Sequence, residues 1–230
     1  MKVEIRHSPA YAVARCWLAP NESIKVQPGA MMAHSFGVTL TAKAEGGVLR
    51  GIGRMLGGES FHVSTFTAPQ QGGWVDVIPE TVGDVVSVNV DMNTDFVLTR
   101  GAWLANDGKI DIKPDTSVSS LFAGEGLVIL RAQGQGNLII SSYGALDVVS
   151  LKEGEGFTVD SGHLVGWESR VRMQTRKAAT GFMNSLKSKE GLVVDLHGPG
   201  DIIMQTRVPS AVTQATQSNS NFGITDLLGN

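Results

Sequence analysis

Short runs of apolar residues, alternating with polar ones or continuous, recur along the whole chain. Val85–Val90 and Leu127–Leu130 are typical, since they are rich in Val, Ile and Leu and lie between Gly, Asn or Asp residues. Side chains alternate across a pleated strand, and Gly, Asn and Pro supply the turns between strands. The pattern therefore predicts an all-β chain of many short strands, of the β-sandwich or jelly-roll type.

Three landmarks recur at a nearly constant interval. The first is a turn glycine followed by a small residue or His and then two bulky apolar residues, and its copies begin at Gly29, Gly101 and Gly162. The second is a glutamate before an apolar run, 66 and then 65 residues apart, at Glu59, Glu125 and Glu190. A third, strand-like landmark starts at Trp74, Asn137 and Asp201.

Self-similarity at a fixed interval indicates that one β unit was copied, and that no copy buries its apolar face alone. We predict one all-β domain over residues 1–207, made of three tandem pseudo-equivalent modules at about 14–83, 84–147 and 148–207. Gln, Ser, Thr and Asn dominate after Val208, so residues 208–230 are predicted to be a polar C-terminal tail.

Each module carries a variable insertion before its glutamate, and two insertions have helical spacing of apolar residues. In Val48–Leu56 the residues concerned are Leu49, Ile52, Met55 and Leu56, with Arg50 and Arg54 on the polar side. Several glycines lower the helix propensity of this segment, so we expect a partner to order it. It is predicted to dock within an oligomer, on a protein partner or on a membrane surface.

Charge and composition narrow the functions further. Lys and Arg number 19 and Asp and Glu 22, giving a net charge of −3, so we expect no nucleic acid as partner. The single cysteine, Cys16, has apolar neighbours and is predicted to be a buried, unreactive thiol. No secretion signal or membrane-spanning run is present, and we expect a cytoplasmic location.

Asp160 and His163 form the one pairing that suggests chemistry, since a carboxylate can orient an imidazole for acid–base or metal work. Only one module has this pair, which favours a turn-stabilising role. The recurring glutamates are likewise expected to be structural. No nucleophile motif or metal-ligand spacing is found, so we predict a protein that is not an enzyme, with no catalytic residue, cofactor or metal.

An ordered set of Gly-rich motifs resembles the altered inheritance of mitochondria protein 24 family. The motifs are Pro28–Met31, the Gly51–Phe61 stretch with Gly51, Arg54 and Gly57–Phe61, Phe122–Gly126, Asp160–Val165, Glu190–Leu192, Gly198–Gly200 and Gln205–Arg207. The resemblance implies a fold similar to that of the tryptophan RNA-binding attenuation protein, with three repeats per chain and homotrimers that arrange nine repeats in a ring. The family supplies no accepted biochemical activity.

Three hypotheses about function follow. The favoured one is a non-enzymatic oligomeric β-scaffold or binding protein, which acts through a ring-like assembly and multivalent surface contacts. The alternatives are a binder of small ligands in clefts between modules or subunits, and an enzyme that uses Asp160 and His163.

Overall fold

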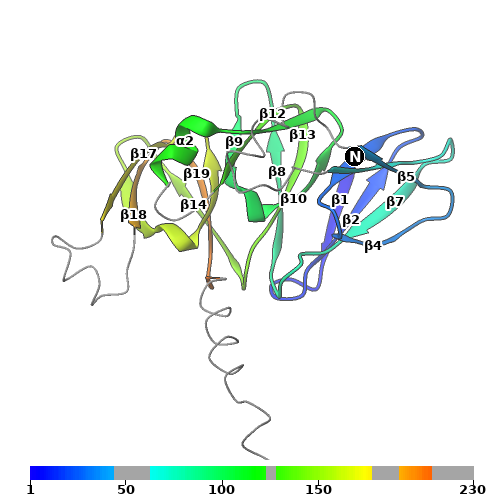
Figure 1. The fold of residues 1–230 in the computed structure, drawn as a ribbon, viewed down its shortest axis with the longest axis horizontal. Helices are drawn as coiled ribbons and strands as arrows, with labels where there is room; N and C mark the ends of the chain where they lie inside the picture. The colour runs from blue at the N-terminus through cyan, green and yellow to red at the C-terminus, as the bar shows by residue number, and fades with distance from the viewer. Residues whose placement is uncertain (44–62, 123–127, 178–191, 209–230) are drawn as a thin grey trace, which may run out of the picture.

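The computed structural model describes residues 1–43, 63–122, 128–177 and 192–208, and these form an elongated body of antiparallel sheets (Figure 1). The prediction of an all-β fold is confirmed. The strands are β1 (Lys2–Arg6), β2 (Val13–Leu18), β3 (Ser23–Val26), β4 (Met31–His34), β5 (Thr39–Lys43), β6 (Val63–Thr67), β7 (Gly73–Val77), β8 (Val85–Val90), β9 (Phe96–Thr99), β10 (Trp103–Asp107), β11 (Ile110–Pro114), β12 (Ile129–Gly134), β13 (Gly136–Ser141), β14 (Leu146–Leu151), β15 (Gly156–Asp160), β16 (Leu164–Glu168), β17 (Arg172–Lys177), β18 (Leu192–His197) and β19 (Gly200–Gln205).

From β2 onward the strands fall into three successive sets of six with one pairing scheme. The first set is β2 to β7, the second set β8 to β13 and the third set β14 to β19. In each set the sixth strand pairs with the first and the third, and the fifth strand pairs with the second and the fourth. Each set therefore contributes two three-stranded half-sheets.

Half-sheets of neighbouring sets join edge to edge. The second strand of one set pairs with the third strand of the next, as β3 does with β10 and β9 with β16. These two joints make two six-stranded sheets. A four-stranded sheet, β1-β2-β7-β4, and a three-stranded sheet, β15-β18-β17, lie at opposite ends of the molecule (Figure 1).

The third strand of every set carries the same irregularity. Its register against the sixth strand shifts between Met31 and Ala33 in β4, between Trp103 and Ala105 in β10, and between Leu164 and Gly166 in β16. An extra residue of this kind, a β-bulge, increases the local twist of the strand. The bulge thus gives all three sets the same bend at the strand that receives the neighbouring set.

The hydrophobic cores are shared between neighbouring sets. Leu104 and Ile139 belong to the second set but are buried in the core of the first. Val165 and Ile203 of the third set are buried in the core of the second. Because the first and second cores are each completed by side chains of the set that follows, burial of these side chains stabilises the joints as well as the individual sets.

Helical structure in the described residues is short. The helix α2 (Thr116–Leu121) lies where the second insertion is predicted, and the Asp115 side chain caps its first turn by accepting a hydrogen bond from the Val118 N–H at 3.1 Å. The turn glycines 101 and 162 lie in single 3-10 turns, η1 (Arg100–Ala102) and η3 (Ser161–His163). None of the helices in the described ranges is long and apolar enough to cross a lipid bilayer.

Candidate functional site

The three turn glycines predicted to be structural differ in whether the backbone conformation or the neighbouring atoms require glycine at that position. Gly29 has φ +85°, a left-handed conformation that strains any side-chain-bearing residue. Gly101 has no positive φ, and a Cβ added there would meet no atom within 4 Å. At Gly162 an added Cβ would lie 3.0 Å from the Val208 side chain. Glycine is thus required by backbone conformation only at the first of the three positions.

Asp160 and His163 both bind backbone groups within the third set. Asp160 Oδ1 accepts a hydrogen bond from the Gly162 N–H at 2.9 Å, and His163 Nδ1 lies 2.7 Å from the carbonyl oxygen of Gln205. The Gln205 side chain returns a hydrogen bond to the Gly162 carbonyl at 2.9 Å and accepts one from the Tyr143 N–H at 2.9 Å. This network ties η3 to β19, an arrangement suited to the turn-stabilising role.

The other predicted site residues lie outside the described residues. They are the glutamates Glu59, Glu125 and Glu190 and the insertion residues Leu49, Arg50, Ile52, Arg54, Met55 and Leu56.

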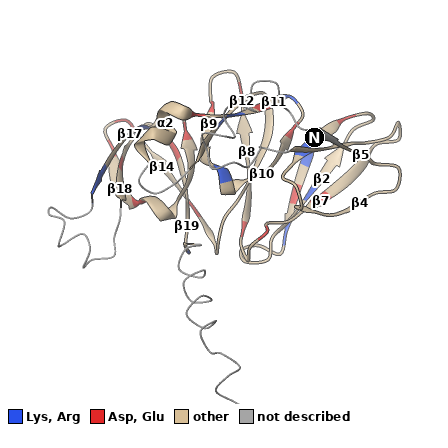
Figure 2. Ribbon diagram, in the orientation of Figure 1, with Lys and Arg blue, Asp and Glu red and all other residues tan. Residues whose placement is uncertain are grey.

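A cluster on the outer face of the β1-β2-β7-β4 sheet was not predicted from the sequence. The Arg15 guanidinium lies 4.0 Å from the ring centre of Trp74 and 5.5 Å from that of Trp17, and it donates two hydrogen bonds of 2.8 Å to the Asp76 carboxylate. Arg6 adds a third at 2.9 Å. Basic and acidic residues are otherwise interspersed along the ribbon (Figure 2).

Two opposing effects act on the pKa of Asp76. Burial raises it, but hydrogen bonds and charge attraction from Arg15, together with those from Arg6, outweigh burial and hold the pKa below its usual range. The carboxylate, 1% exposed, is therefore a buried charge with two partners. In the sequence, the sign of this cluster is that Arg15 and Trp17 alternate with the small residues Ala14 and Cys16, so that Arg15 and Trp17 share one face of β2.

Cys16 is fully buried, as its apolar neighbours predict. Burial raises the pKa of its thiol to about 12, so the thiolate that nucleophilic or redox chemistry needs does not form near neutral pH.

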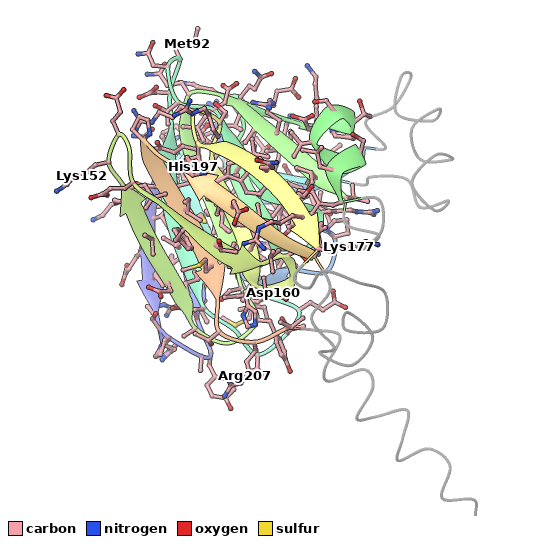
Figure 3. The ribbon with its side chains drawn as sticks, turned by 90° about the vertical axis from the view of Figure 1, so that its left-hand side faces the viewer. Met92, Lys152, Asp160, Lys177, His197 and Arg207 are labelled. Carbon is pink, nitrogen blue, oxygen red and sulfur yellow. The ribbon has the colours of Figure 1, made fainter. Side chains whose placement is uncertain are left out.

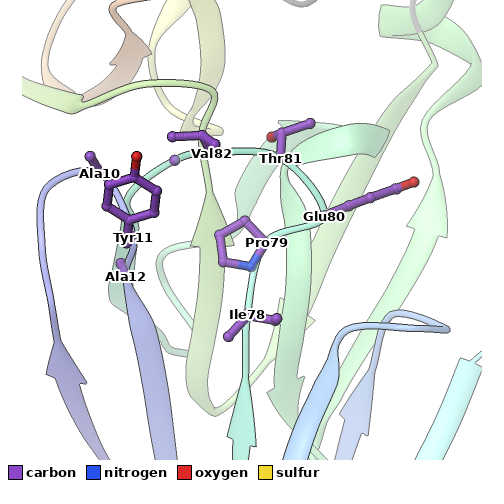
Figure 4. Close-up of a pocket in the computed structure, with 9 residues that line it drawn as sticks. Ala10, Tyr11, Ala12, Ile78, Pro79, Glu80, Thr81 and Val82 are labelled. Carbon is purple, nitrogen blue, oxygen red and sulfur yellow. The ribbon is translucent and has the colours of Figure 1, made fainter.

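A small cavity lies where the first set passes into the second. Its volume is about 250 Å³, and Tyr11, Ile78, Pro79 and Val82 supply its apolar walls (Figure 4). Tyr11 is 72% exposed and Val82 54% exposed, so the mouth is open to solvent. Glu80 points away from the centre in this view. The cavity suits a small, mainly apolar group.

Ligands for a metal do not gather in the part of the chain that the structure describes: no three His, Cys, Asp or Glu side chains there are placed to share an ion.

Comparison with known proteins places these features in a family. The chain is 30% identical over 216 residues to an uncharacterized protein of Streptococcus pyogenes serotype M6, covering 90% of this chain and 86% of the relative. It is also similar to a Streptococcus pyogenes protein of known crystal structure, a structural genomics target, with a TM-score of 0.78 and 26% identity over 95% of this chain and 99% of the other. The model of the family described as mitochondrial biogenesis AIM24 matches residues 3–207. The ordered motifs, the β architecture and this match over nearly the whole described body agree, and the chain belongs to the AIM24 family.

Proposed function

We propose that this protein is a non-enzymatic scaffold that works as an assembly of several copies and presents their surfaces together. Each six-strand set is, in this proposal, one of the three modules predicted from the sequence. The recurring pairing scheme and the recurring bulge support that assignment.

The observation that carries the proposal is that no set is self-contained. The core of the first set is completed by Leu104 and Ile139, and that of the second by Val165 and Ile203. Within residues 1–208 that the structure describes, gaps aside, no further set follows the third to play this part. A repeat whose core is completed by the next repeat favours association of chains. The first set of one copy can cover the core of the third set of another copy, as the following set does within one chain.

Assembly supplies a mechanism of action. Several weak contact surfaces held on one rigid body engage a partner surface at high effective concentration, so their combined affinity exceeds that of one copy. The insertion Val48–Leu56, outside the described residues, is the sequence's candidate for such a contact. Deleting residues 48–56 is expected to reduce retention on a protein partner or on liposomes without changing the mass of the particle, and unchanged retention would count against this contact.

Light scattering coupled to size-exclusion chromatography tests the assembly itself. We expect a particle with the mass of several chains that persists on dilution to the micromolar range. A particle with the mass of a single chain would overturn the proposal.

Binding of a small ligand is a second candidate, which the cavity beside Tyr11 and Val82 favours. A thermal-shift screen with small amphiphilic metabolites should then find a compound that raises the melting temperature. The variant Ile78→Trp, which fills the cavity, should abolish the shift, whereas Glu80→Gln, whose side chain points away, should retain it. A shift that survives Ile78→Trp would place the ligand elsewhere.

A further inference from the structure

We propose that the cavity between Tyr11 and Val82 is the docking site of this chain's own C-terminal segment, residues 224–228, which covers the cavity until a competing ligand displaces it. Such docking goes beyond the proposed scaffold and does not require assembly of several copies. Three features support it: the size and chemistry of the cavity, the place where the described chain leaves the body, and the sequence of the segment.

The cavity has the size and chemistry for one or two apolar side chains rather than for a drug-sized molecule. Its volume is about 250 Å³, below the range of about 300–1,000 Å³ that is typical of ligand pockets. Its walls are largely apolar, and two of the side chains that line it, Tyr11 and Val82, remain 72% and 54% exposed. An apolar segment that covered them would remove this surface from water.

The cavity belongs to a row of linkers that runs along one edge of the body (Figure 1). Tyr11, in the linker after β1, forms a parallel bridge with Gly83, in the linker after β7, and Gly83 forms another with Gly144, in the linker after β13. The Arg207 N–H, after β19, donates a hydrogen bond of 3.3 Å to the Tyr143 carbonyl. Because hydrogen-bonded neighbours lie about 4.8 Å apart, the chain leaves the body about 10–15 Å from the cavity.

The sequence after Val208 suits this distance. Residues 209–223 carry no charge and are rich in Ser, Thr, Gln and Asn. A flexible coil of about 15 residues has a root-mean-square end-to-end distance of about 20 Å. The local concentration of a tethered group is highest, in the millimolar range, when this length is close to the span to its site. Even a weak contact would therefore keep the cavity occupied.

The segment that would reach the cavity is apolar on one side. Ile224, Leu227 and Leu228 have the spacing i, i+3 and i+4, which places their side chains on one face of a helical turn. An amphipathic turn laid into an apolar groove is a recurring mode of peptide recognition. Residues 224–228 therefore offer the cavity the apolar side chains that its walls favour.

A docked tail competes with any small ligand of the cavity. With a tethered concentration of about 1 mM and a dissociation constant taken as about 0.1 mM for the free segment, the tail fills roughly nine cavities in ten. A competing ligand then binds about tenfold more weakly, because only the open fraction accepts it. Release of the tail would thus control access to the cavity.

A labelled peptide with the sequence of residues 222–230 tests the site in the full 230-residue chain. The variant Leu227→Asp/Leu228→Asp, called the released variant, changes the tail and leaves the described body untouched. Fluorescence anisotropy should show that the peptide binds the released variant about tenfold more tightly than wild type, where the chain's own tail competes. Equal affinity for the two proteins, or binding to neither, would overturn the docking.

Two further variants locate the peptide. Val82→Asp, added to the released variant, should abolish peptide binding. Met92→Asp is the same kind of change at an 84% exposed residue, which lies at the opposite end of the view from Arg207 (Figure 3), and it should leave peptide binding intact. Peptide binding that survives Val82→Asp would place the segment elsewhere and overturn the proposal. So would a small molecule that fills the cavity of wild type and of the released variant with equal affinity.

A disulfide distinguishes the chain's own tail from the tail of a second copy. Val82→Cys/Leu227→Cys should form an intramolecular disulfide under mild oxidation, seen as a single chain that migrates faster without reducing agent. In the control, Val82→Cys/Ala215→Cys, the tail cysteine is nearer to Val208 along the chain. Random encounters favour this shorter loop, whereas docking favours Leu227→Cys. Cys16 is fully buried and does not compete.

An equal or higher yield in the control, or disulfides that form only between chains, would overturn docking of the chain's own tail. Neither result bears on the scaffold proposal, which depends on the mass of the particle.

Discussion

At the scale of single residues, Asp76 shows how the fold keeps a charge that is buried from solvent: two arginine side chains bind the carboxylate. Its carboxylate is 1% exposed and accepts hydrogen bonds from Arg15 and Arg6. Removing one partner of a buried, hydrogen-bonded ion pair leaves the other without compensation. Asp76 is therefore expected to stabilise the first set rather than to act on a ligand.

We predict that Asp76→Asn lowers the free energy of unfolding at pH 7 by about 1.5–3 kcal/mol, the typical worth of hydrogen bonds to a charged group. Because folding lowers the pKa of Asp76, its contribution is complete above the unfolded-state pKa of about 4 and is lost as the pH falls below it. The difference between wild type and variant in urea melts should therefore shrink between pH 5 and pH 2.5.

The control for this prediction is Asp111→Asn, which removes a carboxylate that pairs with Lys113 at 2.6 Å but is 50% exposed. Solvent screens such a pair, so its loss should cost less than about 1 kcal/mol. Equal effects of the two substitutions would contradict the assignment of Asp76 as a structural charge.

Gly83 is expected to tolerate no side chain. A Cβ there would lie 1.7 Å from the Ser142 carbonyl oxygen, a backbone atom that cannot move aside cheaply. Gly83→Ala should therefore lower the free energy of unfolding by about 1–3 kcal/mol or more. Gly101→Ala, at a position with open space and no positive φ, should change it by less than about 1 kcal/mol, and calorimetric melts of both variants check the contrast.

The sequence predicted single residues unevenly. Burial of Cys16 followed from its apolar neighbours, because apolar alternation is a local signal. The partnership of Arg15 with Asp76 joins residues 61 positions apart, and nothing local specifies it. Gly83 was likewise missed, since its requirement comes from Ser142 in the next linker.

At the scale of elements, alternation predicted strands such as β8 at its actual bounds, Val85–Val90. The 3-10 turns at Gly101 and Gly162 were read from the sequence only as turns, and the bulges were not predicted at all. Both depend on how the third strand meets the sixth, which is a long-range pairing. Tertiary context of this kind decides details that periodicity leaves open.

The hydrogen bond that joins η3 to β19 can be tested by substitution of His163. His163→Ala removes the bond to the Gln205 carbonyl, and we expect a loss of about 0.5–1.5 kcal/mol in the free energy of unfolding. His197→Ala, at an exposed position of β18, is the control and should have a smaller effect. A His163→Ala variant as stable as wild type would weaken the turn-stabilising role and return weight to the hypothesis of chemistry at Asp160 and His163.

At the scale of the whole molecule, the sets are linked through shared sheets and shared cores, so the chain should unfold as one unit. The sequence landmarks predicted three modules, but they could not predict which strand of one set pairs with which strand of the next. That choice is made by the joints β3·β10 and β9·β16. Because of this pairing, side chains of one set are buried in the core of the preceding set and stabilise it.

Leu104 tests this coupling, because it belongs to the second set and is buried in the core of the first. Leu104→Ala removes a fully buried side chain, and we expect a loss of about 2–5 kcal/mol. Protection of backbone amides against hydrogen exchange should fall in β2 and β7 of the first set as much as in β10. Leu40→Ala, at a 53% exposed position of β5, should leave that protection nearly unchanged. Loss of protection confined to the second set would mean that the cores are separate units, and the reason for expecting the terminal sets to seek a neighbour would then disappear.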